Sequence, residues 1–471
     1  MVRKKKKQPI LEDVLIEDVG AEGKSLARVE GKVIFVPMML PGDVVDVQLR
    51  KNKDNFAEGY PLRIKKYSDL RIKPECEHFG VCGGCHWQHL PYEKQLEYKE
   101  KQVLDIFERL GQIRGFEARP ILPSEKVYRY RNKLEFTFSR MRWLTNEEIK
   151  SGEENLDKRG LGFFMPKKFF RILDINECHL QPEPSNAIRI ALKEFVLENG
   201  LEIYDPRMME GFIRSIIVRN TSTNEWLIIV TFHHESEWIQ KTLDYLIEKF
   251  PQLTSVHYVI NPKVNDVITD LPTISYYGKP FISEEMEGLS FKISPKSFYQ
   301  TNSRQAYNLY KITRDFAELT GDETVYDLYT GTGTIANFIA RSCKQVIGVE
   351  YVEEAVVDAR INSEDNGIKN TTFVAGDMKD VMNEEFLEKH GRPNVIITDP
   401  PRAGMHKDVV KTILKAAPDK IVYVSCNPAT QMRDIKLMNE DYQLIRMQPV
   451  DMFPHTYHVE NVALLKRKDV V

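Results

Sequence analysis

The last third of the chain repeats short apolar segments, each followed by a stretch with helical periodicity. These segments are TVYDLY (324–329), QVIGVE (345–350), NTTFVAG (370–376), NVIITD (394–399) and KIVYVSC (420–426). Apolar runs of this length that alternate with helices are typical of parallel strands covered on both faces. We therefore expect a Rossmann-like α/β sheet over residues 291–471, with YHVENVALLKRK (457–468) as an added edge strand or hairpin.

Residues 10–65 show a different pattern, in which short β-branched runs alternate with glycine turns. Closely spaced short strands favour a small β-barrel. The segment LPGDVVDVQL (40–49) resembles the TRAM domain, an OB-like barrel found on RNA-modifying enzymes. We expect this unit over residues 1–66, including a basic tail that contains Lys4–Lys7.

The middle of the chain mixes both periodicities. NKLEFTFS (132–139) and EWLIIVTFHH (225–234) are typical of strands, whereas SNAIRIALKEFVLENG (185–200) has helical spacing. A further helix is predicted over Pro91–Leu110 from an apolar stripe formed by Leu96, Val103, Ile106 and Phe107. We interpret residues 67–290 as a central α+β domain, with Asn146–Arg159 as an exposed insertion. The predicted protein is therefore multidomain: a barrel, an α+β domain and an α/β domain.

Composition limits the function classes. The 471 residues are 42% hydrophobic and 29% charged, which is the balance of a soluble globular protein. No apolar run reaches 18 residues and no signal-peptide segment follows the basic start, so we expect a cytoplasmic protein without a membrane partner. The net charge of −3 does not indicate a nucleic-acid partner, but the first 66 residues carry 14 Lys and Arg against 10 Asp and Glu. Such a basic tail adds salt-dependent attraction to phosphates, although it is more often simply solvated.

A glycine-containing loop follows the first strand of the repeated pattern. In DLYTGTGT (327–334), Gly331 allows a tight turn and a close approach of a ligand to the backbone. Glu350 ends the second strand, where a carboxylate can bind a ribose diol, and Asp377 follows the third, where it can reach an adenine amino group. The pattern predicts an adenosine-containing ligand. NAD enzymes share this architecture, but the third glycine of G-x-G-x-x-G is absent.

The fourth and fifth strands end in chemically suggestive loops. DPPR (399–402) resembles the motif of S-adenosylmethionine-dependent methyltransferases that act on nucleic acid, although Asp-Pro is also a common turn. Cys426 ends the fifth strand, and a free cysteine is more often a small buried hydrophobic residue. Ligands, however, bind at the carboxyl edge of open α/β sheets. A thiol beside a methyl donor is therefore a candidate nucleophile, in a loop that Pro428 helps to fix.

Five motifs in order resemble the RNA uracil-5-methyltransferase family: SFYQTN (297–302), DLYTGTGT (327–334), DPPRAG (399–404), SCNPAT (425–430) and HVENVALL (458–465). The resemblance implies that Cys426 adds to C6 of uracil, which makes C5 reactive toward a methyl group, and that Glu460 then removes the C5 proton. It also implies that Gln300, Tyr329, Glu350 and Asp399 contact S-adenosyl-L-methionine. Asp377 rests on its strand position rather than on a motif.

Four further cysteines are spaced C-x5-C-x2-C with a distant fourth: Cys76, Cys82, Cys85 and Cys178. A cytoplasmic location disfavours disulfides, so a metal site is the better interpretation. Three clustered thiolates with one distant ligand suit an iron–sulfur cluster, and the pattern resembles the 4Fe-4S site of the family's rRNA-directed members. Zinc stays open because four histidines lie nearby in the sequence: His78, His86, His89 and His179. We expect a structural or RNA-orienting cluster, and we expect Cys343 to lie in the core.

The RNA side of the prediction rests on fewer residues. YRYRNKLEF (128–136) has the aromatic and arginine content that stacks on bases of a single-stranded or flipped nucleotide, although an amphipathic strand with exposed Arg and Lys would look the same. The leading hypothesis is a monomer that methylates C5 of a uridine in 23S rRNA, because tRNA-directed relatives commonly lack both the barrel and the four cysteines. The alternatives are tRNA uridine methylation and a non-catalytic RNA-binding protein. An amino-group methyltransferase would leave Cys426 unexplained.

Overall fold

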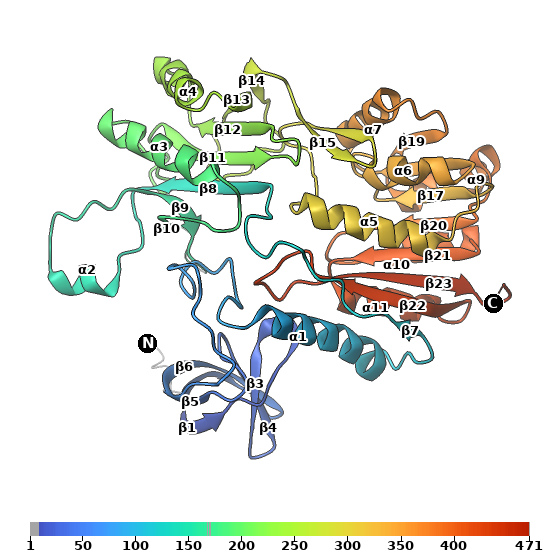
Figure 1. Ribbon diagram of the computed structural model, residues 1–471, viewed down its shortest axis with the longest axis horizontal. Coiled ribbons are helices and arrows are strands. Elements are labelled where there is room, and N and C mark those ends of the chain that lie inside the picture. Colours follow the sequence, from blue (N-terminus) through green and yellow to red (C-terminus); the bar gives the residue numbers. More distant parts are fainter. Residues whose placement is uncertain (1–8, 167, 169–170, 471) are drawn as a thin grey trace, which may run out of the picture.

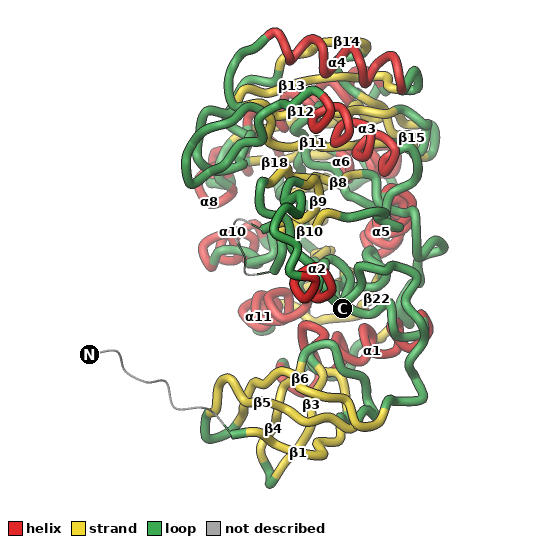
Figure 2. The backbone as a smooth tube through the Cα atoms, turned by 90° about the vertical axis from the view of Figure 1, so that its left-hand side faces the viewer, coloured by secondary structure: helices red, strands yellow, loops and turns green. Residues whose placement is uncertain are grey.

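The computed structural model describes residues 9–166, 168 and 171–470, and the predicted basic run Lys4–Lys7 lies outside this part (Figure 1). The described strands form three large sheets and one two-stranded sheet, and helix α1 (Tyr92–Leu104) lies between the first sheet and the last (Figure 1). Viewed from the side, the first sheet forms one end of the molecule (Figure 2). Within the described residues, none of the helices combines the length and the apolar content needed to span a bilayer.

The N-terminal sheet contains six of the described strands in the order β1-β5-β6-β4-β3-β2. Strands β4 and β6 are parallel, and the other neighbours are antiparallel. Because β1 also lies against β3, the sheet curves around a core that includes Ile34, Val45 and Val47. The predicted small barrel is therefore present. Its elements are β1 (Ile10–Leu15), β2 (Asp18–Val19), the 3-10 turn η1 (Ala21–Gly23), β3 (Ser25–Val29), β4 (Lys32–Val36), β5 (Val44–Asn52) and β6 (Phe56–Lys66).

The middle sheet contains seven of the described strands in the order β10-β9-β8-β11-β12-β13-β14, and only its β12–β13 pair is parallel. Helices α3 and α4 pack on one face, whereas Ile217, Leu227 and Ile229 point to the core of the C-terminal region. Helix α2 lies in the predicted insertion and has no buried residue. The elements are β8 (Lys133–Ser139), α2 (Asn146–Ser151), β9 (Gly160–Phe164), β10 (Ile172–Asp174), α3 (Ser185–Glu198), β11 (Ile213–Asn220), β12 (Trp226–Phe232), α4 (Glu237–Lys249), β13 (Leu253–Ile260) and β14 (Ile274–Gly278).

The C-terminal sheet has the order β19-β18-β17-β20-β21-β23-β22-β7 among the described strands. Its first five strands are parallel, and β23 runs antiparallel between β21 and β22. The predicted Rossmann-like sheet is confirmed, and the predicted final segment is the second strand of a hairpin. The strands are β17 (Thr324–Leu328), β18 (Gln345–Glu350), β19 (Thr371–Ala375), β20 (Val395–Thr398), β21 (Lys420–Ser425), β22 (Tyr442–Val450) and β23 (Glu460–Arg467).

Helices cover both faces of this sheet because side chains along each strand alternate between two cores. Val325 and Val422 face α5, α6 and α7, whereas Tyr326 and Tyr423 face α1, α10 and α11. Cys343 is buried on the first face, as predicted. The helical elements are α5 (Ser303–Ala317), α6 (Thr334–Ile339), η3 (Ala340–Ser342), α7 (Glu353–Asp365), α8 (Met378–Val381), α9 (Glu384–His390), α10 (Lys407–Ala416) and α11 (Pro428–Met438).

Some segments lie with a different sheet from the one that their position in the sequence suggests. Helix α1 is the predicted helix, and it continues as the π-helical turn η2 (Asp105–Leu110), but it packs on the C-terminal sheet, where β7 (Glu117–Ala118) pairs with β22. The predicted limit at 290/291 falls inside β16 (Leu289–Ile293), which pairs with β15 (Ile282–Met286) and packs against α7. We therefore propose that the C-terminal unit begins before β15 and includes residues 92–122.

Candidate active site

The glycine loop after β17 is closed by a buried carboxyl group. Asp327 accepts hydrogen bonds from the Ala336 backbone N–H (3.1 Å) and the Thr330 hydroxyl, which ties the start of α6 to the end of β17. Burial raises the pKa of Asp327 to about 7. The two glycines differ: a Cβ on Gly333 would lie 2.8 Å from the Ala359 Cβ, whereas a Cβ on Gly331 would meet nothing within 4 Å. Gly333 serves packing, and Gly331 faces the open space that a ligand needs.

Glu350 and Asp377 lie at the same sheet edge, because β17, β18 and β19 are parallel neighbours. Glu350 accepts hydrogen bonds from the backbone N–H groups of Gly331 (3.0 Å) and Val352 (2.9 Å), so its carboxylate borders the glycine loop. Asp377 caps α8 through the Lys379 N–H (3.2 Å) and pairs with the Lys379 ammonium at 3.1 Å. The hydrogen bond from Lys379 lowers the pKa of Asp377. Both carboxylates stand where the sequence predicted a nucleoside site.

Gln300 lies at the junction of the middle and C-terminal sheets. The Asn132 side-chain amide donates to the Gln300 carbonyl (2.9 Å), and the Asn302 amide donates to the Met452 carbonyl (3.0 Å). Asn302 also caps α5. Tyr329 follows β17 with a φ of 63° and is half-buried. Burial raises the pKa of the Tyr329 hydroxyl to about 12, so this side chain is a neutral hydrogen-bonding group beside the loop.

Cys426 is positioned by a helix cap next to it in the sequence and by one contact to the loop of the adjacent strand. Asn427 caps α11 through the Ala429 N–H (3.2 Å), and Pro428 occupies the first turn of that helix. The Asn427 amide also donates to the Arg402 carbonyl (3.1 Å), which fastens the SCNP loop to the DPPR loop of the neighbouring parallel strand. Burial raises the pKa of the Cys426 thiol to about 11; Glu460 and Asp399 raise it further, and Arg402 lowers it.

Glu460 lies beside this thiol because of strand register. It begins β23, whose Asn461 is opposite Ser425 of the antiparallel strand β21. Glu460 is only 4% exposed, and its backbone pairs with Val450, but its carboxyl group forms no hydrogen bond or ion pair with the described residues. Burial raises its pKa well above the usual range, and burial raises the pKa of the half-buried Asp399 to about 7. Buried carboxyl groups without cationic partners are a suitable environment for a positively charged ligand.

The loop 451–459 leads from β22 to Glu460 and is covered by elements from the first third of the chain. The backbone N–H groups of His86 and Trp87 donate to the His455 carbonyl at 2.7 and 3.0 Å. A Cβ on Gly23 of the barrel would lie 2.8 Å from the Tyr457 Cβ. Burial lowers the pKa of His455 and His458 to about 4, so both imidazoles are neutral near pH 7. No motif in the sequence marks these contacts.

The four predicted metal ligands line one cavity of about 590 Å³, together with Arg131 and Lys133. Burial raises the pKa of Cys85 to about 12 and that of Cys178 to about 11. Within the described part of the chain, no three His, Cys, Asp or Glu side chains are close enough to hold a single metal ion. A 4Fe-4S cluster binds each thiolate to a different iron and so accepts thiols that are farther apart, and four thiols around one cavity fit its ligand set.

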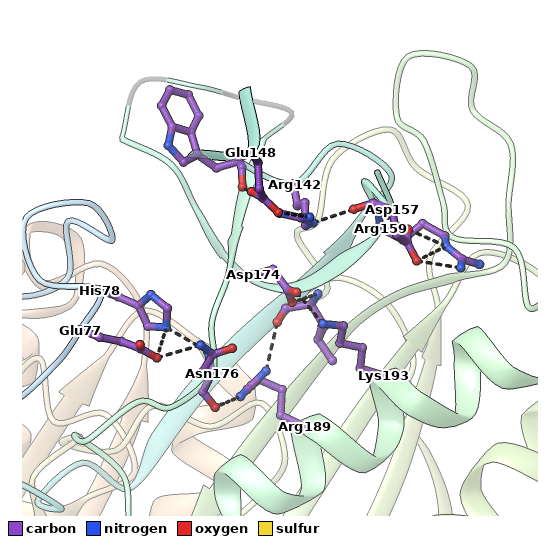
Figure 3. Close-up of polar contacts among 12 residues, drawn as sticks. Glu77, His78, Arg142, Glu148, Asp157, Arg159, Asp174, Asn176, Arg189 and Lys193 are labelled. Atoms are coloured by element: carbon purple, nitrogen blue, oxygen red, sulfur yellow. Dashed lines mark hydrogen bonds and ion pairs between the residues drawn. The ribbon is translucent and has the colours of Figure 1, made fainter. Parts of the chain in front are cut away.

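A polar network holds the cysteine loop against the middle sheet (Figure 3). The Asn176 backbone N–H donates to His78 Nε2 (2.9 Å), and its side-chain amide donates to Glu77 (2.8 Å). The buried Arg189 donates to the Asn176 carbonyl (2.7 Å). These contacts bring the loop that carries Cys76 to the segment just before Cys178.

The segment 128–136 connects these parts instead of forming an open base-stacking surface. Tyr130 is buried and donates to the Pro454 carbonyl (3.1 Å), so its ring is not available to RNA. Arg129 donates to the carbonyls of Cys178 (3.1 Å) and Gln181 (3.0 Å). The Tyr128 ring lies 4.4 Å from the His455 ring. Within this segment, the groups that face the cysteine cavity include Arg131 and Lys133.

Comparisons with known proteins show which family this chain belongs to. Residues 221–468 match the family model described as tRNA (Uracil-5-)-methyltransferase, and residues 12–62 match the TRAM domain model. A protein of Bacteroides thetaiotaomicron named as an uncharacterized RNA methyltransferase is 54% identical over 452 residues, which are 95% of this chain and 100% of the relative. A protein of Chlorobaculum tepidum with the same description is 40% identical over 466 residues, 97% of this chain and 96% of the relative.

A solved structure is similar over nearly the whole length. It is the crystal structure of the Pyrococcus abyssi tRNA (uracil-54, C5)-methyltransferase in complex with S-adenosyl-L-homocysteine. The two chains are 30% identical with a TM-score of 0.75, and the match covers 96% of this chain and 99% of the other. The chain therefore belongs to the RNA uracil-5-methyltransferase family and carries an N-terminal TRAM domain.

Proposed function

We propose that this protein methylates C5 of a uridine in 23S rRNA, with S-adenosyl-L-methionine as the methyl donor. The observation that carries the chemistry is the register that brings the thiol of Cys426 beside the buried carboxyl group of Glu460. Methylation of an amino group needs no nucleophilic thiol, and RNA binding alone needs neither group. Membership of the family supports the reaction type.

The donor site is proposed from the residues at the carboxyl edge of the sheet. Gly331 leaves room for the ligand, Glu350 and Asp377 suit its nucleoside, and Asp399 suits a positive charge. Gln300 and Tyr329 complete the set. When bound, S-adenosyl-L-methionine supplies an electrophilic methyl group on a positively charged sulfur. The P. abyssi relative was solved with S-adenosyl-L-homocysteine, which supports this choice.

Cys426 starts the reaction. Its thiol gives its proton to water, and the thiolate adds to C6 of uracil, which places the electron pair on C5 as an enolate. That pair would form the new bond from C5 to the methyl group as the methyl–sulfur bond of the donor breaks, which would leave S-adenosyl-L-homocysteine. Arg402 favours the thiolate because its positive charge lowers the pKa of Cys426.

Glu460 ends the reaction. Its carboxylate removes the proton from C5, the C5–C6 double bond re-forms, and the C6–S bond breaks to return the thiolate. Burial raises the pKa of Glu460, so the group must first lose its own proton, which the positive charge of a bound donor would favour. Once ionised, it is a stronger base than an exposed carboxylate. Because a paired uridine hides C6, the target nucleotide must be unpaired or flipped into the site.

We also propose that Cys76, Cys82, Cys85 and Cys178 hold a 4Fe-4S cluster that ties the cysteine loop to the middle sheet. The shared cavity and the all-thiol donor set support this assignment. Anaerobic purification with iron, sulfide and zinc analysis tests it. About four iron and four sulfide per chain are expected, and equimolar zinc without sulfide would rule the cluster out.

A tRNA uridine is the second candidate, and one observation favours it. The P. abyssi enzyme, named for uridine 54 of tRNA, matches 96% of this chain, so the barrel does not by itself separate the two targets. The rRNA proposal rests on the resemblance of the four-cysteine pattern to rRNA-directed members.

The test is incubation with labelled S-adenosyl-L-methionine and either total rRNA or total tRNA, followed by mapping of the product. We expect 5-methyluridine in 23S rRNA. Labelled tRNA with unlabelled rRNA would select the second candidate. Glu460→Gln is expected to accumulate a covalent RNA adduct, because elimination stalls. Normal turnover of this variant would show that Glu460 is not the base.

A further inference from the structure

The loop 451–459 sets the direction from which Glu460 approaches the reacting base. It connects β22 to β23 and ends immediately before the carboxylate. A general base must lie within hydrogen-bond reach of the proton that it removes, so a small displacement of this loop affects proton removal directly. The groups that fix the loop are therefore of functional interest.

One face of helix α1 contacts this loop. Tyr92, Gln95 and Lys99 are spaced by three and four residues, so they lie on the same side of the helix. The Lys99 ammonium forms an ion pair with Asp451 at 2.6 Å, with both side chains fully buried, and donates to the Phe453 carbonyl at 3.1 Å. The Tyr92 hydroxyl donates to the other Asp451 oxygen at 2.7 Å. Both carboxylate oxygens of Asp451, at the start of the loop, are thus bound by side chains of α1.

Gln95 holds the middle of the same loop. Its side-chain carbonyl accepts from the His455 backbone N–H at 2.8 Å, and its amide nitrogen lies 3.2 Å from His455 Nδ1. That amide also donates to the Trp87 and Leu90 carbonyls at 3.0 and 2.9 Å. His455 has a φ of 66°, a left-handed conformation that non-glycine residues rarely adopt. The surrounding contacts must therefore impose this conformation.

Apolar residues would pack this interface without the desolvation that a buried ion pair requires. Polar contacts fix the orientation of the loop as well as its position, because hydrogen bonds require a narrow range of distances and angles. We propose that Tyr92, Gln95 and Lys99 are positioning residues that orient the loop 451–459 so that Glu460 removes the C5 proton. This inference rests on the proposed function. It adds a helix that lies outside the residues matched by the uracil-5-methyltransferase model.

The experiment compares full-length variants in single-turnover and steady-state methylation, with gel analysis of covalent RNA adducts. Gln95→Leu keeps the side-chain size and removes the contacts to His455. Tyr92→Phe is the milder second variant, since it removes only a hydroxyl. Glu97→Gln is the matched control, because Glu97 lies on the same helix but is exposed and pairs with Lys94 at the surface.

We expect Gln95→Leu to lower kcat by roughly 10- to 100-fold with little change in KM for RNA. The burst of methyl transfer should persist and the adduct should accumulate, because only proton removal is slowed. Tyr92→Phe should show the same signature at a few-fold effect, and Glu97→Gln should match the wild type.

A purely structural role predicts a different result. It lowers the burst and the steady-state rate in the same proportion, with no accumulated adduct, and that result would overturn the proposal. Turnover equal to Glu97→Gln in both test variants would also overturn it. If Gln95→Leu does not fold, Tyr92→Phe decides the question. A wild-type protein that forms neither 5-methyluridine nor an adduct would instead refute the proposed function.

Discussion

The two halves of the proposed catalytic pair are held in place by different means. Cys426 is fixed by its neighbours: Asn427 and Pro428 start α11, and Arg402 lies in the loop of the adjacent strand. The loop that carries Glu460 is fixed by helix α1 and by the barrel, and its contacts to Gln95 and Lys99 span 360 and 352 residues of sequence. One half is a local motif, and the other is assembled by tertiary packing.

This difference has a mechanistic consequence. The thiol needs one defined position at a sheet edge, and a strand end followed by a capped helix supplies it. In the proposed reaction, the carboxylate acts only after the thiolate has added and the methyl group has been transferred. It must then lie within reach of the proton on C5. A loop held by separate elements allows the position of Glu460 to depend on the barrel and the cysteine loop, which are the parts of the chain expected to contact RNA.

The largest effect on methylation activity is expected when Cys426 is replaced. Cys426→Ala should lower methylation by on the order of 10⁴-fold or more, because no other group replaces the nucleophile. Thermal stability should change little, because Cys426 is only half-buried and lies just after the end of β21. Cys343→Ala is the control: it should keep activity while lowering stability, since Cys343 is buried in the core. Residual activity of Cys426→Ala within tenfold of wild type would refute covalent catalysis.

The second-largest effect is expected at the buried ion pair between Lys99 and Asp451, which holds the loop that leads to Glu460. Lys99→Met should destabilise the protein by about 3–5 kcal/mol, because it leaves the Asp451 carboxylate buried without its partner. The double variant Lys99→Met with Asp451→Leu should recover most of that loss, since both charges are then removed. Urea denaturation measures the difference. A single variant as stable as the wild type would show that the pair is not buried in solution.

A pH dependence tests the local electrostatics of Cys426. Because its pKa is raised to about 11, the ligand-free protein holds a thiol at pH 7, and only the thiolate reacts with iodoacetamide. Alkylation of Cys426 should therefore rise roughly tenfold per pH unit between pH 7 and 10. Arg402→Gln should slow it at each pH, since Arg402 lowers the pKa. Peptide mass spectrometry follows the site, and a rate that levels off near pH 8 would contradict the prediction.

The smallest expected effect is on kcat, when the contact between the barrel and the loop 451–459 is disturbed. A second barrel variant controls for loss of barrel stability. Gly23 and Gly31 both have positive φ values, 66° and 81°, so alanine at either position should cost roughly 1–2 kcal/mol. Only at position 23 would the new Cβ collide with Tyr457, since nothing lies within 4 Å at position 31. Gly23→Ala should lower kcat a few-fold, whereas Gly31→Ala should leave it unchanged. Equal rates in both variants would mean that the barrel does not influence the loop.

Local periodicity was enough to predict the C-terminal sheet and the edge at which Gly331, Glu350, Asp399 and Cys426 lie. Parallel strands share a carboxyl edge, so residues that follow successive strands must meet there. The same reasoning placed Asp377 at this edge. The apolar stripe also predicted α1, which the structure contains with a widened last turn.

Periodicity did not predict which polar and aromatic side chains are buried between the elements. Gln95 and Lys99 have the residue types of a solvated helix face, yet both are fully buried. Tyr130 has the composition of a base-stacking surface, yet its ring is enclosed. The four cysteines meet at one cavity although Cys178 is far from the others in sequence.

The sequence alone therefore determined the parallel sheet, the helix α1 and the edge at which the candidate side chains lie, because spacing along a strand or helix directly sets which side chains share a face. Only the tertiary structure decided which core received α1, which polar groups became buried, and how Glu460 came to stand beside Cys426. The physical reason is that long-range packing depends on the shapes and charges of surfaces that meet in space, and a local pattern of residues does not specify its distant partner.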